Sequence, residues 1–240
     1  MSISLGRMRT SAITGLVAAA TALSVVLAGC DSGKDASASS DNNPTSAAAT
    51  AATPGPDAGS DKAGDGPNPT IASYIKDNKI PEKQVHRTDD GEPKVELPKP
   101  TGWRSTGDDN PPWAYDSIVY NGPVDPKDYA PSVIALLSKL PGDVDAKALM
   151  ATAPGEIQNL PGFTPSGPGT ETKVRSYPAY RIAGTWVSDG KTKFVAQQTV
   201  IFPANGATYV LQLNSDGSAE QTPIVQAATD TVARQVTITP

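Results

Sequence analysis

Residues 177–190, YPAYRIAGTWVSDG, decide the fold class together with the stretch that follows them. Tyr180, Ile182 and Trp186 lie on one side of this stretch, and such alternation is typical of a strand with one face in the core. The stretch ends in Asp189-Gly190, a dipeptide favoured in two-residue hairpin turns because these turns require positive φ. The sequence therefore predicts that this strand is the first strand of a β-hairpin.

A second turn extends this hairpin to three strands. Residues 193–203, KFVAQQTVIFP, form the next predicted strand, Asn205-Gly206 forms the next turn, and residues 207–214, ATYVLQLN, form the third strand. Strands joined by tight turns pair antiparallel. We therefore expect an α+β fold with a largely antiparallel, twisted sheet that helices cover.

Further elements are predicted on both sides of these strands. A helix is expected at residues 70–78, with Thr70 as its cap, and another at 145–152, with a further turn at 156–160. A last helix is expected after the capping box of Ser218 and Gln221, and its buried stripe consists of Ile224, Val225, Ala228 and Val232. Strands are expected at residues 94–98, 102–106, 113–122, 132–140 and 236–239. Within residues 132–140, the run from Val133 to Leu137 is apolar on both faces, which fits a covered, central strand.

The first thirty residues predict where the protein works. Arg7 and Arg9 precede an apolar run that ends in Leu-Ala-Gly-Cys at Cys30, and this order is typical of a secretory signal peptide. The last four residues resemble a bacterial lipobox. Residues 1–29 are therefore predicted to be a lipoprotein signal peptide, and Cys30 the lipidation site; the alternative is a plain secretory signal with a chance cysteine. Acylation of Cys30, for example with palmitate, would anchor the chain in the cell membrane, on its extracytoplasmic face.

Residues 30–69 are predicted to be the lipidated cysteine and a disordered Ala/Ser/Pro tether, because this stretch contains no aromatic and no large aliphatic residue. Residues 70–240 are expected to form a single domain. The whole chain has a net charge of −5. Arg7 and Arg9 contribute +2, and the six acids and two lysines of residues 31–69 contribute −4, so the domain carries −3. This weakly acidic balance argues against a nucleic-acid partner.

Seven stretches together resemble the LpqN/LpqT-type lipoproteins of mycobacteria and their relatives: TIASYIKDN, VHRTDDGEP, WAYDSIVY, SVIALLSKLPGDVD, APGEIQNLPGF, SYPAYRIAGTWV and QQTVIFPANGATYVLQLN. The resemblance implies a PsbP-like α/β/α sandwich and an envelope lipoprotein without an established catalytic motif. It also implies an accessory or ligand-binding role in envelope glycolipid traffic. Of the family's functional positions, it assigns only Cys30.

The sequence offers few catalytic candidates. His86 is the only histidine, and it lies near Asp89 in the polar stretch QVHRTDDGEP. A hydrolase that uses His86 remains an alternative, although no G-x-S-x-G motif accompanies it. The adjacent pairs Asp89-Asp90 and Asp108-Asp109 are more typical of turns than of paired catalytic carboxylates. We therefore predict a protein that is not an enzyme, has no cofactor and binds no metal; with Cys30 acylated, no cysteine remains for a disulfide or a zinc site.

The aromatic residues are the candidate binding residues. Trp103, Trp113 and Tyr115 gather around the stretch GWRSTGDDNPPWAY, and Trp186 and Phe163 are further candidates. Such side chains can stack on sugar rings or contact an acyl chain, or they can simply close one end of the core. The leading hypothesis is an accessory protein that binds an amphiphilic lipid or glycolipid, or envelope transport proteins. The alternative is an adaptor without a ligand pocket, and an apolar cleft near Trp103 and Trp113 would distinguish the two.

Overall fold

The structure is a computed structural model, and it describes residues 66–240. The predicted signal peptide, Cys30 and the predicted tether up to residue 65 lie outside the described residues, so these remain predictions. The residues directly before the first helix contact the rest of the fold, because Asn68 and the side chain of Asn159 exchange hydrogen bonds of 2.9–3.1 Å.

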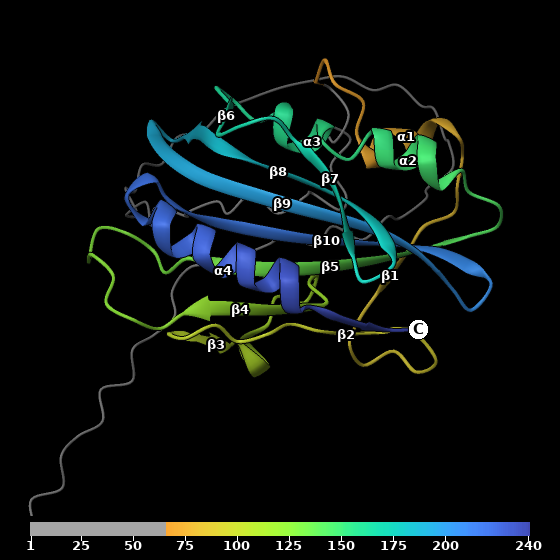
Figure 1. The fold of residues 1–240 in the computed structure, drawn as a ribbon, viewed down its shortest axis with the longest axis horizontal. Helices are drawn as coiled ribbons and strands as arrows, with labels where there is room; N and C mark the ends of the chain where they lie inside the picture. Colours follow the sequence, from red (N-terminus) through yellow and green to blue (C-terminus); the bar gives the residue numbers. More distant parts are fainter. Residues whose placement is uncertain (1–65) are drawn as a thin grey trace, which may run out of the picture. The chain divides into compact units, whose positions relative to one another are not determined.

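Nine strands of the described part form one sheet in which every pair is antiparallel, in the order β3-β4-β5-β10-β9-β8-β6, with β1 paired to β5 and β7 to β8 (Figure 1). β2 and β11 form a separate two-stranded ribbon. The strands are β1 (Lys83–Val85), β2 (Lys94–Glu96), β3 (Trp103–Ser105), β4 (Asp116–Tyr120), β5 (Ser132–Pro141), β6 (Thr164–Pro165), β7 (Thr170–Val174), β8 (Tyr177–Ser188), β9 (Lys191–Ala204), β10 (Ala207–Ser218) and β11 (Thr237–Thr239). This arrangement confirms the predicted α+β class with a largely antiparallel sheet.

The two predicted turns set the register of the longest strands. Asp189 and Gly190 have φ of 51° and 72°, and Asn205 and Gly206 have φ of 49° and 71°. Positive φ at both central positions matches the right-handed twist of the flanking strands. Residues 179–188 of β8 pair with 191–200 of β9, and residues 193–204 of β9 pair with 207–218 of β10, without a bulge.

Three strands have no counterpart among the sequence predictions, namely β1, β6 and β7. They contain two to five residues, and β6 and most of β7 are exposed, so neither a hydrophobic run nor a regular alternation marks them. A fourth difference lies at β4, which begins at Asp116 and not at Trp113. The residues before it form a turn, in which the backbone N–H of Ala114 donates to the carbonyl oxygen of Pro111.

Helices cover both faces of the sheet. They are α1 (Ile71–Asp77), α2 (Ala146–Ala151), α3 (Gly155–Gln158) and α4 (Thr222–Gln235), with short 3₁₀ turns η1 (Gly107–Asp109) and η2 (Ala219–Gln221). The predicted cap of α1 is present, because the Thr70 hydroxyl accepts from the backbone N–H of Ser73 at 3.0 Å. At the start of η2 and α4, Gln221 Oε1 accepts from the backbone N–H of Ser218 at 2.8 Å, as the capping-box prediction requires.

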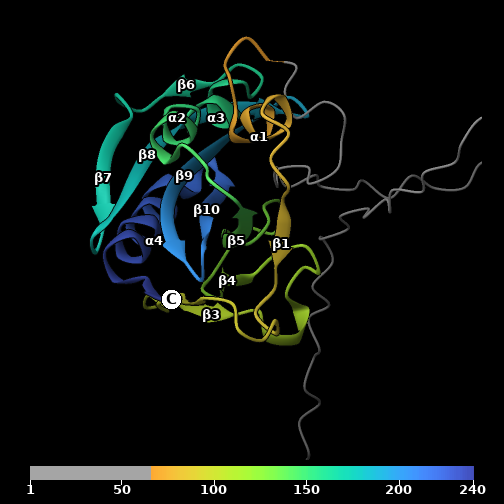
Figure 2. The same ribbon diagram turned by 90° about the vertical axis from the view of Figure 1, so that its right-hand side faces the viewer.

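The two faces of the sheet bury different clusters because side chains alternate along each strand. Leu211 is paired with Val200 and Leu137 and packs in the main core with Ala228 and Val232 of α4. Its neighbours on the opposite face, including Val210 and Ile201, pack with Ile75 of α1 and Leu149 of α2. Figure 2, seen with Figure 1, places α4 and the group α1–α3 on different sides of the β9–β10 hairpin.

The β2–β11 ribbon extends the α4 face of the core. Val95 of β2 and Ile238 of β11 are 0% and 3% exposed and belong to the same cluster as Leu211. The ribbon therefore lies against the β4–β5 part of the main sheet, and this brings the residues that follow β2 close to those that precede β4.

Candidate functional site

A cleft of about 380 Å³ lies where the β2 ribbon meets the β3–β4 edge of the sheet. Its lining comes from three segments, residues 86–88, 96–99 and 105–118. This volume is within the range of about 300–1,000 Å³ that is usual for small-molecule sites. The cleft is the candidate site because loop, ribbon and sheet residues that are distant in sequence converge there.

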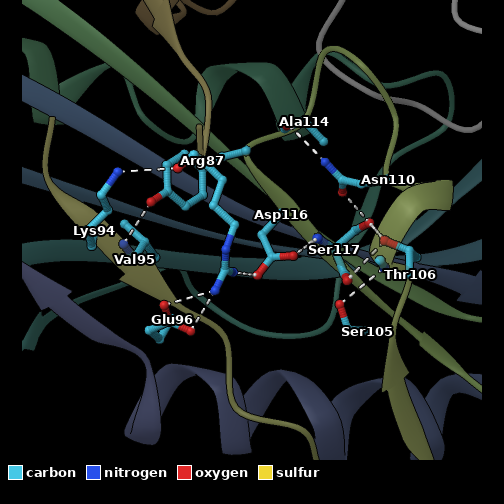
Figure 3. Close-up of polar contacts among 12 residues, drawn as sticks. Arg87, Lys94, Val95, Glu96, Ser105, Thr106, Asn110, Ala114, Asp116 and Ser117 are labelled. Atoms are coloured by element: carbon cyan, nitrogen blue, oxygen red, sulfur yellow. Dashed lines mark hydrogen bonds and ion pairs between the residues drawn. The ribbon is translucent and has the colours of Figure 1, made fainter. Parts of the chain in front are cut away.

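One wall of the cleft is a network of three charged side chains (Figure 3). Arg87 Nη2 donates to both carboxylate oxygens of Glu96 at 2.9 Å, and Arg87 Nη1 donates to Asp116 Oδ2 at 2.5 Å. The Asp116 side chain is 12% exposed, whereas those of Arg87 and Glu96 are 46% and 61% exposed. Burial raises the pKa of the Asp116 carboxyl, and the charge of Arg87 and the backbone N–H of Ser117 act in the opposite direction. Arg87 thus joins a carboxylate inside the fold to one at the surface.

The floor of the cleft is fixed by Tyr115. This residue is 2% exposed, and its hydroxyl accepts from the backbone N–H of Val95 at 3.0 Å and donates to the carbonyl oxygen of Pro93 at 3.4 Å. Burial raises the pKa of the Tyr115 hydroxyl, so it remains a neutral donor and acceptor. These bonds hold the β2 ribbon against the strand that carries Asp116.

A chain of polar side chains continues from the charged network into the loop between β3 and β4 (Figure 3). The Ser117 hydroxyl lies 2.7 Å from the Thr106 hydroxyl and donates to Asn110 Oδ1 at 2.7 Å, and Asn110 Nδ2 donates to the carbonyl oxygen of Ala114 at 3.1 Å. These bonds fix the loop between β3 and β4, which contributes Pro111, Pro112 and Ala114 to the cleft. Together with Leu97 and Ile118, which are 7% and 1% exposed, these residues are the apolar part of the cleft lining.

The structure brings together some of the aromatic candidates and separates others. Tyr115 lines the cleft, whereas Trp103 is 8% exposed and packs edge-on against Tyr120 in the core at 5.8 Å between ring centroids. Trp113 is half-buried beside the cleft, its carbonyl oxygen accepts from the Gln84 side chain, and its indole N–H is buried without a partner. The cleft is lined by both polar and apolar residues, and neither Trp103 nor Trp113 is among them.

Trp186 and Phe163 lie in a different cluster. Trp186 is 7% exposed and packs with Ile157 of α3 and Ile182 on the sheet face away from α4, with Phe163 against the same cluster. The predicted aromatic residues are thus divided between the two faces of the sheet: Trp103 and Tyr115 belong to the main core on the α4 face, and Trp186 and Phe163 belong to the cluster on the other face.

His86 lines the cleft, but its contacts are those of a loop anchor. Its Nε2 lies 3.1 Å from the carbonyl oxygen of Pro112, and the Asp89 carboxylate accepts from the backbone N–H of His86 and not from its ring. A catalytic carboxylate would instead orient the imidazole. The geometry therefore gives His86 and Asp89 a role in holding the 86–93 loop.

A second polar cluster lies on the other face of the sheet, below α3. Glu156 Oε2 accepts from the side-chain amides of Gln197 and Gln212 at 3.2 and 2.7 Å, and Gln197 also donates to Asn214 Oδ1 at 2.9 Å. Burial raises the pKa of Glu156, although both amides act in the opposite direction. These bonds attach the short helix α3 to β9 and β10.

Sequence reasoning missed the charged residues of the cleft, namely Arg87, Glu96, Lys99 and Asp116. One signal could have indicated the site: Asp116 begins the strand DSIVY, and a carboxylate at a core-facing strand position favours either a cationic partner or a raised pKa. Among residues 66–240, no group of three or more His, Cys, Asp or Glu side chains is placed to hold a metal ion. Within the same range, no helix has the length and apolar character needed to cross a membrane.

Comparisons with known proteins identify the family. The model of the family described as "Probable lipoprotein LpqN" matches residues 67–239. The chain is 43% identical to lipoprotein LpqN of Mycobacterium tuberculosis over 175 residues. This alignment covers 73% of this chain and 76% of that protein. It also resembles the crystal structure of an LpqN described as involved in cell envelope biogenesis of M. tuberculosis, with 44% identity and a TM-score of 0.68 over 73% of this chain and all of that one. The chain therefore belongs to the LpqN family of lipoproteins, as the resemblance in its sequence implied.

Proposed function

We propose that this chain is a lipid-anchored accessory protein of cell-envelope biogenesis that binds an amphiphilic lipid or glycolipid in the cleft beside Arg87. The observation that carries the proposal is the mixed lining of the cleft. Its charged residues include Arg87, Glu96 and Asp116, and its apolar residues include Leu97, Ile118 and the exposed Pro112. An amphiphile has a part for each kind of residue, because its head group needs hydrogen-bonding partners and its chain gains from contact with apolar surface.

The anchor would be the acylated Cys30, which would hold the protein at the extracytoplasmic face of the cell membrane. Membership of a lipoprotein family supports this placement. A flexible chain of the length of the predicted tether spans about 35 Å root-mean-square. The cleft would then work close to the membrane surface, within reach of lipids or of transport proteins in that membrane.

An adaptor that only binds other proteins is the second candidate. It is favoured by the buried positions of Trp103 and Trp186, which leave Tyr115 as the aromatic residue that lines the cleft. In that case, the exposed charges of Arg87 and Glu96 would contact a partner protein, and no lipid would be retained.

Native mass spectrometry distinguishes these candidates. The test uses residues 31–240. All of the solved LpqN chain is matched by 73% of this chain, so the part of this chain that is matched has a counterpart that folds by itself. The purified protein is exposed to a cell-envelope lipid extract, and a retained species of defined mass is the expected result. Ser105→Trp should fill the cleft and abolish retention, whereas Thr170→Trp, on the exposed part of β7, should leave it unchanged. A bare protein in repeated extracts would reject lipid binding and favour the adaptor.

A further inference from the structure

Within the cleft, Arg87 is held by two carboxylates that differ in exposure. Asp116 lies on the core face of β4 with 12% of its side chain exposed, and Glu96 lies on the β2 ribbon with 61% exposed. Arg87 Nη2 donates to both oxygens of Glu96 at 2.9 Å while Nη1 donates to Asp116, so Nη2 is the nitrogen to which an oxygen of another carboxylate or of a phosphate would bind in place of Glu96. Glu96 therefore occupies the position that an anionic group of a ligand would occupy.

The two ion pairs should differ in how easily they break. Exposed ion pairs contribute little to stability because water and salt screen them and side-chain entropy opposes them. The inner pair is different, because its removal would leave the buried Asp116 carboxylate without a cation. Glu96 can thus leave Arg87 at small cost while Asp116 keeps the guanidinium in place.

The charge of the cleft changes when Glu96 leaves. With Glu96 in place, Arg87 and Lys99 are balanced by Glu96 and Asp116. Lys99 is exposed, lines the cleft, and forms no ion pair within residues 66–240, so its ammonium group is available to a ligand. Without Glu96, the cleft has two cations and one carboxylate, and its lining also includes the exposed Pro112 and the partly accessible edge of Leu97, which is 7% exposed.

We infer that the cleft takes an amphiphile with an anionic head group, a phosphate or a carboxylate, and that this group replaces Glu96 on Arg87. The inference rests on the proposed function and narrows the class of ligand. Glu96 acts as an internal competitor in the empty protein, and Lys99 adds a second cationic contact in the complex.

The test measures binding of dodecyl phosphate, dodecyl maltoside and inorganic phosphate to residues 31–240 by isothermal titration calorimetry, with both amphiphiles below micelle-forming concentrations. Glu96→Gln removes the competitor and should increase the affinity for dodecyl phosphate about fivefold, with no change for dodecyl maltoside. Lys99→Gln should lower the affinity for dodecyl phosphate about threefold. Glu171→Gln removes the same charge from exposed β7 and should leave all affinities unchanged.

The outcomes separate this inference from the proposed function. If dodecyl maltoside binds as tightly as dodecyl phosphate and Glu96→Gln changes neither, the anionic head group is rejected while amphiphile binding stands. If neither amphiphile binds, both proposals are rejected. If inorganic phosphate binds as tightly as dodecyl phosphate and responds equally to Glu96→Gln, the anion site stands and its lipid occupant is rejected.

Discussion

Asp216 is the residue whose burial has the clearest consequence for stability. It is 5% exposed, its Oδ1 accepts from the hydroxyl of Tyr129, and its Oδ2 is buried without a hydrogen-bond partner. The Lys193 ammonium lies 4.9 Å from the centroid of the Tyr129 ring on the same side of the sheet. Asp128 is bound to Ser218 at 3.1 Å nearby. Burial raises the pKa of Asp216 to about 6, although Tyr129 and Lys193 act in the opposite direction.

This raised pKa predicts a pH dependence with a definite sign. Between the pKa of an unfolded aspartate, about 3.9, and that of folded Asp216, the folded chain binds more protons than the unfolded chain. The contribution of Asp216 to stability therefore falls as pH rises through this interval and remains low above it. An asparagine side chain at this position does not ionise, but its amide oxygen can still accept from Tyr129.

We therefore expect Asp216→Asn to raise the melting temperature, relative to the parent protein, more at about pH 7.5 than at about pH 4.5. The difference should amount to a few degrees, since 1 kcal/mol corresponds to about 2–4 °C in a domain of this size. Differential scanning calorimetry of both proteins at both pH values measures it. Asp189→Asn, in an exposed turn, is the control and should show no such difference. Equal shifts at the two pH values would contradict the assignment.

At the scale of elements, the β9–β10 hairpin depends on its turn. Gly206 has φ of 71°, and a Cβ added there would meet no atom within 4 Å, so only the backbone conformation resists a side chain. A left-handed conformation costs an L-residue with a Cβ about 1–2 kcal/mol. The strands that this turn joins form the longest pairing in the sheet.

Gly206→Ala should accordingly lower the free energy of unfolding by about 1 kcal/mol, as measured by urea denaturation at neutral pH. Gly167→Ala is the matched control. Its Cβ also meets open space, but its φ is not in the left-handed region, so the free energy of unfolding should not fall. An equal loss in both variants would show that φ at residue 206 is not the cause.

At the scale of the whole described fold, the β2–β11 ribbon connects the C-terminal segment to the cleft. Ile238 of β11 is 3% exposed in the main core and is paired with Val95 of β2. The following residues, Glu96 and Leu97, line the cleft. Loss of the Ile238 side chain should therefore loosen both the core and one wall of the cleft.

Ile238→Ala should cost about 2–5 kcal/mol in urea denaturation, the range for truncation of a buried Ile, and should weaken lipid retention. Thr239→Ala, at the exposed neighbouring position, should leave both properties unchanged. Retention at the parent level in a folded Ile238→Ala protein would show that the ribbon does not shape the cleft.

The sequence by itself determined the elements whose signals are local. The turn dipeptides Asp189-Gly190 and Asn205-Gly206 predicted the register of β8, β9 and β10, and Thr70 and Ser218 predicted the starts of helices. These signals act within a few residues along the chain, where sterics and capping bonds suffice. The α+β class follows from them, because hairpin strands with apolar faces need helices to cover them.

Only the tertiary structure decided the pairing of β5 with β10, that of β2 with β11, and the cleft. Arg87 is 29 residues from Asp116, and the ribbon that carries Glu96 is completed by the C-terminal strand. Such contacts depend on which faces bury one another, and the alternation of apolar residues in one strand does not indicate which strand pairs with it. For the same reason, the sequence indicated the region around Tyr115 but could not show that Arg87, Glu96 and Asp116 would converge there.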